Sequence, residues 1–557
     1  MASEQSPLLP NQSRDDNAPP AGKASKRTSR IRELALFIWA LLATAAVIIL
    51  AVVAQHHQQT GKPHHGNPKR NLVFMVSDGM GPASLSLTRS FRQHVEGLPI
   101  DDTLSLDRHF WGTSRTRSSN SLVTDSAAGA TAFSCGKKSY NGAISVTPDY
   151  EPCGTVLEAA KRAGYMTGLT VTTDITDATP ACFASHVLYR SMEDEIALQE
   201  VGDGVLGRTV DLMLGGGRCH FLPNSTEGSC RADNLDVAKL AQDKYNWTYT
   251  DDRAGFDALD GGNKAQLPLM GLFASGNFPF EIDRRTRDDI YPSLSEMAST
   301  ALRALELATK DSDQGFFLMI EGSRIDHAAH INDPAAHVRE VIEYDKAFKA
   351  VLDFIERSDT ETVLVATSDH ETGGLATALQ EPGHSPVYNW YPQALADASA
   401  SCELLAYKLL RHISSHPTES DKKLKTWIND NLIIPGLGIK DATDEELTLL
   451  ADYPDASIEI LAAMISLRAY VGWSTHGHTA VDVNIYSSGG HRPESIRGNV
   501  ENTDVGRFLS EYLSVDVDAI TKELRKKMDL GSDGFGVAQA ADEFEHYHHQ
   551  PSAVGTY

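Results

Sequence analysis

Cysteine is scarce in this sequence, and basic residues are fewer than acidic ones. Six cysteines in 557 residues exclude a small secreted fold held by a dense disulfide framework. Cys219 and Cys230 nevertheless bracket a short Gly/Pro/Asn loop and could form one bridge in an oxidising compartment. The 50 lysines and arginines against 75 aspartates and glutamates leave a net charge of −25. A polyanion would repel such a chain, which excludes nucleic acid as a partner.

Charged residues are also absent from one long stretch, residues 34–54, which has the sequence LALFIWALLATAAVIILAVVA. As a helix this stretch would be ~31 Å long, which is enough to cross the hydrocarbon core of a bilayer. A cleaved signal peptide is the alternative, but the stretch is too long and 33 residues precede it. The N-terminal flank is basic and the other flank is not, which orients the N-terminus toward the cytosol. The sequence thus predicts a cytosolic tail (1–33), a single-pass membrane anchor (34–54) and a linker (55–70).

Three short motifs fit this orientation. Asn224 and Asn246 begin the sequons NST and NWT, which are glycosylated only in a secretory lumen. In the tail, EQSPLLP places Glu4 four residues before Leu8-Leu9 and resembles the acidic di-leucine signals that sorting adaptors read on the route to lysosomes or vacuoles. We therefore expect a protein of the vacuole membrane with its main domain in the lumen and a sorting adaptor as a partner of its tail.

Beyond the linker, buried apolar strands alternate with long amphipathic helices. The predicted strands are 71–76, 166–173, 315–320 and 361–367. The predicted helices are 154–164, 293–310 and 334–357. This alternation predicts an α/β fold with a largely parallel central sheet and helices on both faces, preceded by the one transmembrane helix.

Composition also suggests where the domain ends. The alternating pattern extends over residues 71–515 and is interrupted at about 380–470 by what we expect to be a mostly helical insertion. Residues 516–557 form a C-terminal segment whose end is polar and rich in glycine. This composition predicts disorder, and a proteolytic lumen could trim the segment as a propeptide.

Polar residues lie in the segments that follow each predicted strand. They are Asp78, Asp177, Thr179, Glu321, Asp326, His330, Asp369 and His370. Each could be an ordinary turn or surface residue, but the carboxyl ends of parallel strands meet at one edge of a sheet. Several carboxylates at one edge would repel each other unless cations neutralise them. Mixed histidine and carboxylate ligands suit Zn²⁺, and an all-oxygen set suits Mg²⁺.

Ser126, in the stretch VTDSAAGATA, has two possible roles. Thr124 or Asp125 could cap a helix here, so that Ser126 lies among the unpaired N–H groups of its first turn. This position also attracts anions, and a serine there could be a nucleophile for a phosphate group. The serine alone does not decide between the two roles.

Five motifs together resemble those of the alkaline phosphatases, in the family's order and near its spacings. They are SDGMG, TDSAAGATA, DATPACFASH, EGSRIDHAAH and SDHETGG, within residues 71–515. The tail, the anchor and the late insertion are most similar to the fungal vacuolar members. The resemblance implies hydrolysis of phosphate monoesters through a phosphoserine on Ser126, with Arg190 clamping the phosphate and Asp125 holding Arg190. It also implies a homodimer.

The same resemblance implies two zinc ions and one magnesium ion. One zinc would bind Asp326, His330 and a distant histidine, for which His478 fits the family's register better than His476. The second zinc would bind three further residues, namely Asp78, Asp369 and His370. Magnesium would bind Asp78, Thr179 and Glu321, with Asp177 reaching it directly or through water.

Two other functions would also account for part of this pattern. Phosphodiesterases and sulfatases share the metal-bearing sheet, but Ser126 and Arg190 together favour monoesters. A non-enzymatic trafficking or binding protein would have lost metal ligands, and none is missing.

The third site departs from the family's usual pattern because Asp177 is typical of bacterial members and His327 of animal members. An all-oxygen shell should favour Mg²⁺, unless His327 turns inward and supplies a nitrogen.

Overall fold

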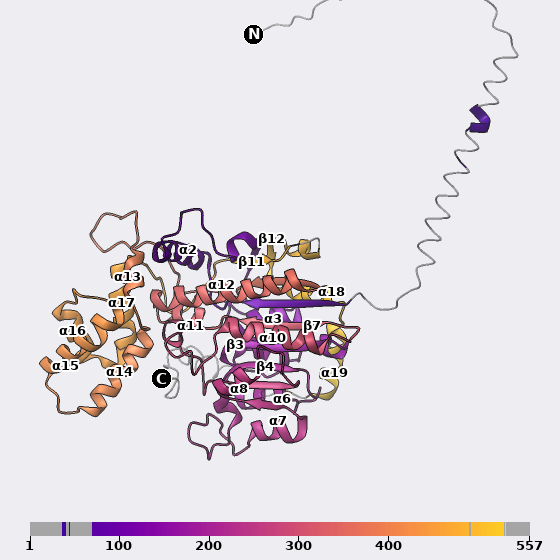
Figure 1. Ribbon diagram of the computed structural model, residues 1–557, viewed down its shortest axis with the longest axis horizontal. Coiled ribbons are helices and arrows are strands. Elements are labelled where there is room, and N and C mark those ends of the chain that lie inside the picture. The colour runs from indigo at the N-terminus through magenta and orange to yellow at the C-terminus, as the bar shows by residue number, and fades with distance from the viewer. Residues whose placement is uncertain (1–35, 40–43, 45–68, 490–491, 529, 531–557) are drawn as a thin grey trace, which may run out of the picture. The chain divides into compact units, whose positions relative to one another are not determined.

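The computed structural model describes residues 36–39, 44, 69–489, 492–528 and 530 (Figure 1). Most of the expected anchor, the tail and the C-terminal end therefore lie outside the described residues. Within the described residues, no helix is both long enough and apolar enough to span a membrane. The chain divides into two units, Met1–Asn67 and Pro68–Tyr557, and the second contains all the elements described below.

The second unit is built on a ten-stranded sheet with the order β12-β2-β11-β8-β1-β7-β3-β4-β6-β5. Its strands are β1 (Arg70–Val76), β2 (Phe110–Arg115), β3 (Met166–Asp174), β4 (Leu212–Gly216), β5 (Thr248–Thr250), β6 (Leu269–Leu272), β7 (Phe316–Glu321), β8 (Glu361–Thr367), β11 (Val483–Ser487) and β12 (Gly498–Glu501). Only β11 pairs antiparallel, with β2 and β8. The predicted, largely parallel α/β sheet is confirmed. Two short strands, β9 (Glu371–Thr372) and β10 (His478–Thr479), pair separately.

Helices cover both faces of this sheet. The helices outside the expected insertion are α2 (Pro82–Glu96), α3 (Ser126–Cys135), α4 (Val156–Arg162), α5 (Ala178–Ala184), α6 (Glu193–Val201), α7 (Val237–Tyr245), α8 (Arg253–Ala258), α9 (Glu281–Arg284), α10 (Leu294–Ala308), α11 (Arg324–His330), α12 (Pro334–Arg357), α18 (Asn502–Leu513) and α19 (Val517–Lys527). Short 3₁₀ turns are η1 (Leu106–His109), η2 (Arg218–Phe221), η4 (Pro454–Ala456) and η5 (Arg492–Ile496).

The central strand β1 shows why the sheet is covered on both sides. All seven of its residues are buried. Leu72 and Phe74 belong to one hydrophobic cluster, with residues of α3, α4 and α18, whereas Val73 and Met75 belong to another, with residues of α10 and α12. Successive side chains of a strand point to opposite faces. A strand between two helical layers is therefore apolar at every position, as the sequence of β1 is.

The expected insertion at about 380–470 contains a separate group of helices. They are α13 (Pro392–Asp397), α14 (Cys402–Ser415), α15 (Asp421–Ile428), the π-helix η3 (Asn429–Leu437), α16 (Asp444–Asp452) and α17 (Ser457–Ala469). Figure 1 shows them together at one end of the unit. Their apolar side chains form a third hydrophobic cluster, which reaches Leu87 of α2 and Ala328 of α11. The insertion is thus packed directly against α11, which carries predicted metal ligands.

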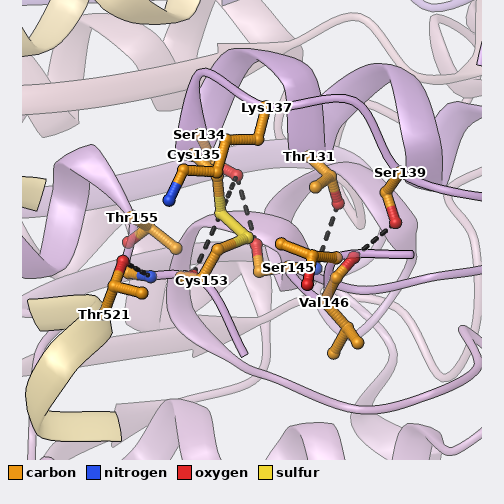
Figure 2. Close-up of a disulfide and its surroundings, with 12 residues drawn as sticks. Thr131, Ser134, Cys135, Lys137, Ser139, Ser145, Val146, Cys153, Thr155 and Thr521 are labelled. Atoms are coloured by element: carbon orange, nitrogen blue, oxygen red, sulfur yellow. Dashed lines mark hydrogen bonds between the residues drawn. A yellow bond between two sulfur atoms is a disulfide. The ribbon is translucent and has the colours of Figure 1, made fainter. Parts of the chain in front are cut away.

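Two disulfides are present. The bridge between Cys219 and Cys230 is the one that the loop composition suggested. A second bridge, between Cys135 and Cys153, joins the last residue of α3 to the segment before α4 (Figure 2). It was not predicted, because its cysteines are 18 residues apart and do not bracket one short loop. The bridge tethers the C-terminal end of the helix that begins with Ser126.

Candidate active site and metal centre

Most of the predicted metal ligands follow four strands that are neighbours in the sheet, β8, β1, β7 and β3. Asp78 lies two residues after β1, and Asp369 lies two residues after β8. Glu321 is the last residue of β7, and Asp177 follows β3 by three residues. These strands are parallel to one another, so their carboxyl ends meet at one edge, where ligands of α/β sheets bind.

Ser126 is the first residue of α3, and Asp125 is the N-cap. One carboxylate oxygen of Asp125 accepts a hydrogen bond from the Ala128 N–H (3.0 Å), and the other accepts one from the Gly142 N–H (2.9 Å). Ser126 Oγ is buried and lies 3.0 Å from His370 Nε2. The cap is therefore Asp125, and Ser126 faces the cluster that follows β8.

Asp78, Asp369 and His370 form the first ligand cluster. His370 Nε2 lies 3.5 Å from Asp78 Oδ1 and 3.2 Å from Asp369 Oδ2. Neither of these buried oxygens has a hydrogen-bond partner among residues 69–489 and 492–528. Burial, followed by the charge of Asp369, raises the pKa of Asp78 well above its usual value. A buried acidic pair with unpartnered oxygens next to an imidazole nitrogen fits a bound cation, which would satisfy both carboxylates.

Asp326, His330 and His478 form the second cluster. His330 Nε2 lies 3.0 Å from His478 Nε2 and 3.2 Å from Asp326 Oδ2. His478 Nε2 lies 3.6 Å from Asp326 Oδ1. His476, the alternative candidate, instead places its Nδ1 2.8 Å from the His330 carbonyl oxygen and its Nε2 3.5 Å from the side-chain amide of Asn332. The structure thus brings His478, and not His476, together with the other two predicted ligands.

The three clustered histidines share one arrangement of ring nitrogens. Nδ1 of His478 donates to the Thr124 carbonyl (2.8 Å), and Nδ1 of His330 donates to the His476 carbonyl. For His370 the partner is Thr372, whose single hydroxyl hydrogen already goes to Asp326 Oδ1, so the hydroxyl must accept from His370 Nδ1. In the neutral rings Nε2 is therefore unprotonated, as a metal ligand requires.

The predicted third site is built from oxygen donors. Burial raises the pKa of Glu321 to about 8, the charges of Asp177 and Asp369 raise it further, and the hydrogen bond from Ser323 opposes the shift. Ser323 Oγ donates to Glu321 Oε2 at 2.6 Å. This mutual repulsion among buried carboxylates again fits a bound cation, and the donor set of carboxylates and a hydroxyl fits Mg²⁺.

Arg190 is held mainly by Asp177. Its Nη2 donates to Asp177 Oδ1 at 2.6 Å, whereas its Nη1 lies 3.6 Å from Asp125 Oδ2. Burial alone would raise the pKa of Asp177, but Arg190 and His327 lower it. The expected contact with Asp125 is present but is the longer of the two. Arg190 therefore connects the helix of Ser126 with the third site.

Two glycines allow the elements to approach one another. Gly79, which has a φ of 73°, lies so close to Asp326 that an added Cβ would be 2.7 Å from its Cα. A Cβ on Gly129 of α3 would be 2.9 Å from the Cβ of Asp369. Larger residues would push α3 and the loop after β1 away from the ligands.

Some residues of the site were missed by sequence reasoning. Thr372 contacts both His370 and Asp326, and its position within SDHETGG was the available signal.

Asp174, Glu193 and His220 form a further group outside the predicted sites. There His220 Nε2 lies 3.0 Å from Glu193 Oε2. Burial lowers the pKa of His220, but Glu193 and its acidic neighbours raise it to about 9. This group is a set of acidic side chains around a histidine whose pKa they raise.

Comparison with known proteins gives one family. The sequence profile of the alkaline phosphatases matches residues 69–515. The repressible alkaline phosphatase of Saccharomyces cerevisiae is 49% identical, with 98% of each chain covered. Among solved structures, a cold-active alkaline phosphatase from a psychrophilic Shewanella species is 30% identical with a TM-score of 0.65, covering 80% of this chain and 99% of that one. A His-to-Asp variant of TAB5 alkaline phosphatase, with Mg bound in the M3 site, is 25% identical with a TM-score of 0.55, covering 81% and 99%.

Proposed function

Since this chain belongs to the alkaline phosphatase family, whose members are metal-dependent hydrolases of phosphate monoesters, we propose that Ser126 is the nucleophile and carries the phosphoryl group as a phosphoserine. The observation that carries this proposal is the position of Ser126 Oγ, buried and 3.0 Å from His370 Nε2 in the first ligand cluster. The N-terminal turn of α3 adds N–H groups that favour a phosphate at this point.

Two zinc ions and one magnesium ion are the proposed cofactors. Asp326, His330 and His478 would hold one zinc, and Asp78, Asp369 and His370 the other. Asp78, Thr179 and Glu321, with Asp177, would hold the magnesium. When bound, the cations supply positive charge that stabilises the Ser126 alkoxide, the leaving oxygen and the phosphoryl group. The solved TAB5 alkaline phosphatase variant has Mg bound in its M3 site, which supports magnesium as one of the proposed ions.

The protein's own groups orient the reaction. Arg190, fixed by Asp177, would bind two phosphoryl oxygens with its planar guanidinium. Asp125 fixes the first turn of α3 through hydrogen bonds from the Ala128 and Gly142 N–H groups, and so would hold Ser126 Oγ in place for attack on the phosphorus. After the alcohol leaves, water attacks the phosphoserine from the vacated side, and inorganic phosphate is released as the Ser126 hydroxyl is restored.

A comparison of three substrates tests this function. p-Nitrophenyl phosphate should be hydrolysed far faster than bis(p-nitrophenyl) phosphate or p-nitrophenyl sulfate, because the Arg190 clamp and the cations fit a phosphoryl group with three free oxygens. A preference for the diester or the sulfate would support the related phosphodiesterase or sulfatase activities instead. Absence of all three activities from metal-loaded protein would support a non-enzymatic role.

We also propose that the chain is a homodimer anchored in the vacuole membrane by residues 34–54, with its active site in the lumen. The match to the yeast relative covers 98% of this chain and so includes most of the segment before residue 69. The side chains of Asn224 and Asn246 are exposed, as lumenal glycosylation requires. Replacing Leu8-Leu9 with alanines should misroute the protein without changing its specific activity, and normal delivery of this variant would contradict the sorting signal.

A further inference from the structure

His327 lies between two predicted zinc ligands on α11, one residue after Asp326 and three before His330. Its ring is held differently from theirs. Arg324 Nη1 lies 3.0 Å from His327 Nδ1. A guanidinium can only donate hydrogen bonds, so Nδ1 must be the accepting nitrogen. In the neutral ring the proton is then on Nε2. Nδ1 is engaged by Arg324 and Nε2 is protonated, so neither nitrogen can ligate a metal.

The guanidinium that sets this tautomer is fixed on two sides. Its Nη2 donates to both carboxylate oxygens of Glu403, at 3.0 and 3.1 Å. Its central carbon lies 3.8 Å from the centre of the Phe280 ring, a stacking contact. The Arg324 side chain is only 2% exposed. Glu403 is in the first turn of α14, so the helical insertion contributes the group that orients Arg324.

We propose that Arg324, held by Glu403, is a positioning residue that keeps His327 from ligating a metal and so makes the third site selective for magnesium over zinc. This inference rests on the proposed function, because it presupposes a third metal site. His327 lies close enough to the third site for its charge to lower the pKa of Asp177. With His327 excluded as a ligand, the remaining donors are carboxylates and the hydroxyl of Thr179, which suit Mg²⁺. A bare imidazole nitrogen would add a ligand that favours Zn²⁺.

Arg324→Met is the direct test, because methionine preserves much of the length over Phe280 but donates no hydrogen bond. His327 Nδ1 can then take the proton and leave Nε2 bare. After dialysis against equal Zn²⁺ and Mg²⁺, mass spectrometry of the metals should show about one extra zinc per chain in place of magnesium. Arg324→Lys, which still only donates, should keep the wild-type ratio. Arg324→Met combined with His327→Gln should return to it.

A second pair of variants avoids removing a buried guanidinium. Glu403→Gln removes the negative charge that pairs with Arg324. It should raise the zinc content as Arg324→Met does, but by a smaller amount. Glu446→Gln is its matched control, since Glu446 holds Arg468 elsewhere in the insertion through two similar bonds of 2.9 and 3.1 Å. The control should leave the metal ratio unchanged. A change in both variants would show a general effect of the insertion and would overturn the proposal.

Asp177→His separates failure of this inference from failure of the proposed site. It places an imidazole directly at the third site and should raise zinc content and reduce activation by magnesium. If Asp177→His does so while folded Arg324→Met and Glu403→Gln retain the wild-type ratio, the role of Arg324 is wrong and the third site stands. If wild type contains no third ion, or three zinc ions, the proposed magnesium site itself is wrong.

Discussion

Four histidines surround the candidate site, and they use their ring nitrogens in two opposite ways. In His330, His370 and His478, Nδ1 donates to an oxygen, which leaves Nε2 unprotonated toward the clustered carboxylates. In His327, Nδ1 accepts from Arg324. The partner of Nδ1, rather than the residue type or its place in the motif, therefore decides which histidine can be a ligand.

The two arrangements also have different structural origins. The oxygens that orient the three clustered rings are carbonyls of the chain around the site, or the hydroxyl of Thr372, all close to the sheet edge. The group that orients His327 depends on Glu403, which belongs to the insertion. Residues of the α/β domain thus orient the histidines that would bind the zinc ions. The choice of the third ion would instead depend on the helical insertion, through Glu403.

The largest effect is expected from removing the proposed nucleophile. This change should abolish catalysis while the histidine and carboxylate ligands still bind zinc. Ser126→Ala should lower monoester turnover by several orders of magnitude, because no other hydroxyl of the described residues is hydrogen-bonded to His370 Nε2. Zinc content and thermal stability should stay near those of the wild type, because the ligand rings keep their partners. The measurement is turnover of p-nitrophenyl phosphate together with metal analysis. Undiminished phosphorylation of the variant would contradict the assignment.

The comparison of His478 with His476 tests whether the orientation of the ring matters. His478→Ala should remove a ligand from the second cluster and lose at least one zinc with most of the activity. His476→Ala should cost much less, because that ring faces Asn332 and the main chain of α11. Activity and zinc content of the two variants are measured side by side. The reverse ranking would make His476 the ligand.

The sequence predicted what depends on local pattern. Continuous apolar strands and the polar residues after them identified the sheet, its parallel character and the edge where the clusters lie. The partners of those residues could not be predicted in the same way. Arg190 contacts Asp177 more closely than Asp125, and Arg324 reaches Glu403 across 79 residues. Such contacts depend on tertiary packing, as does the bridge between Cys135 and Cys153.

A substitution of Thr372 should have a smaller effect. It tests whether the hydrogen bond to His370 Nδ1, which keeps Nε2 unprotonated, supports metal binding. Thr372→Val keeps the shape of the side chain but removes the acceptor for His370 Nδ1 and the donor to Asp326 Oδ1. Loss of such a supporting hydrogen bond should weaken metal binding by roughly 10- to 100-fold. Thr372→Ser should restore most of it, since the hydroxyl returns. The measurement is zinc retention during titration with a chelator, and equal retention in all three proteins would exclude a role for Thr372.

The smallest expected effect is a change in how thermal stability depends on pH. It concerns Glu321 of the third site, where the donors are oxygens, whereas the two zinc clusters also contain histidine nitrogens. In metal-free protein, burial and the neighbouring carboxylates raise the pKa of Glu321 to about 8 from an ordinary value of 4.5. Between these values the folded state keeps a proton that the unfolded state has lost, so folding stability falls as pH rises from about 4.5 to about 8.

Metal-free Glu321→Gln removes this ionisation while preserving the shape of the side chain. Its Tm should therefore fall less between pH 5 and pH 8 than the Tm of metal-free wild type. Other buried acids whose pKa is raised, such as Glu340, are common to both proteins and cancel in the difference. Loading the wild type with metal should also flatten its profile, because a cation at the third site stabilises the ionised carboxylates. Parallel Tm profiles for the two metal-free proteins would show that Glu321 is not under this electrostatic strain.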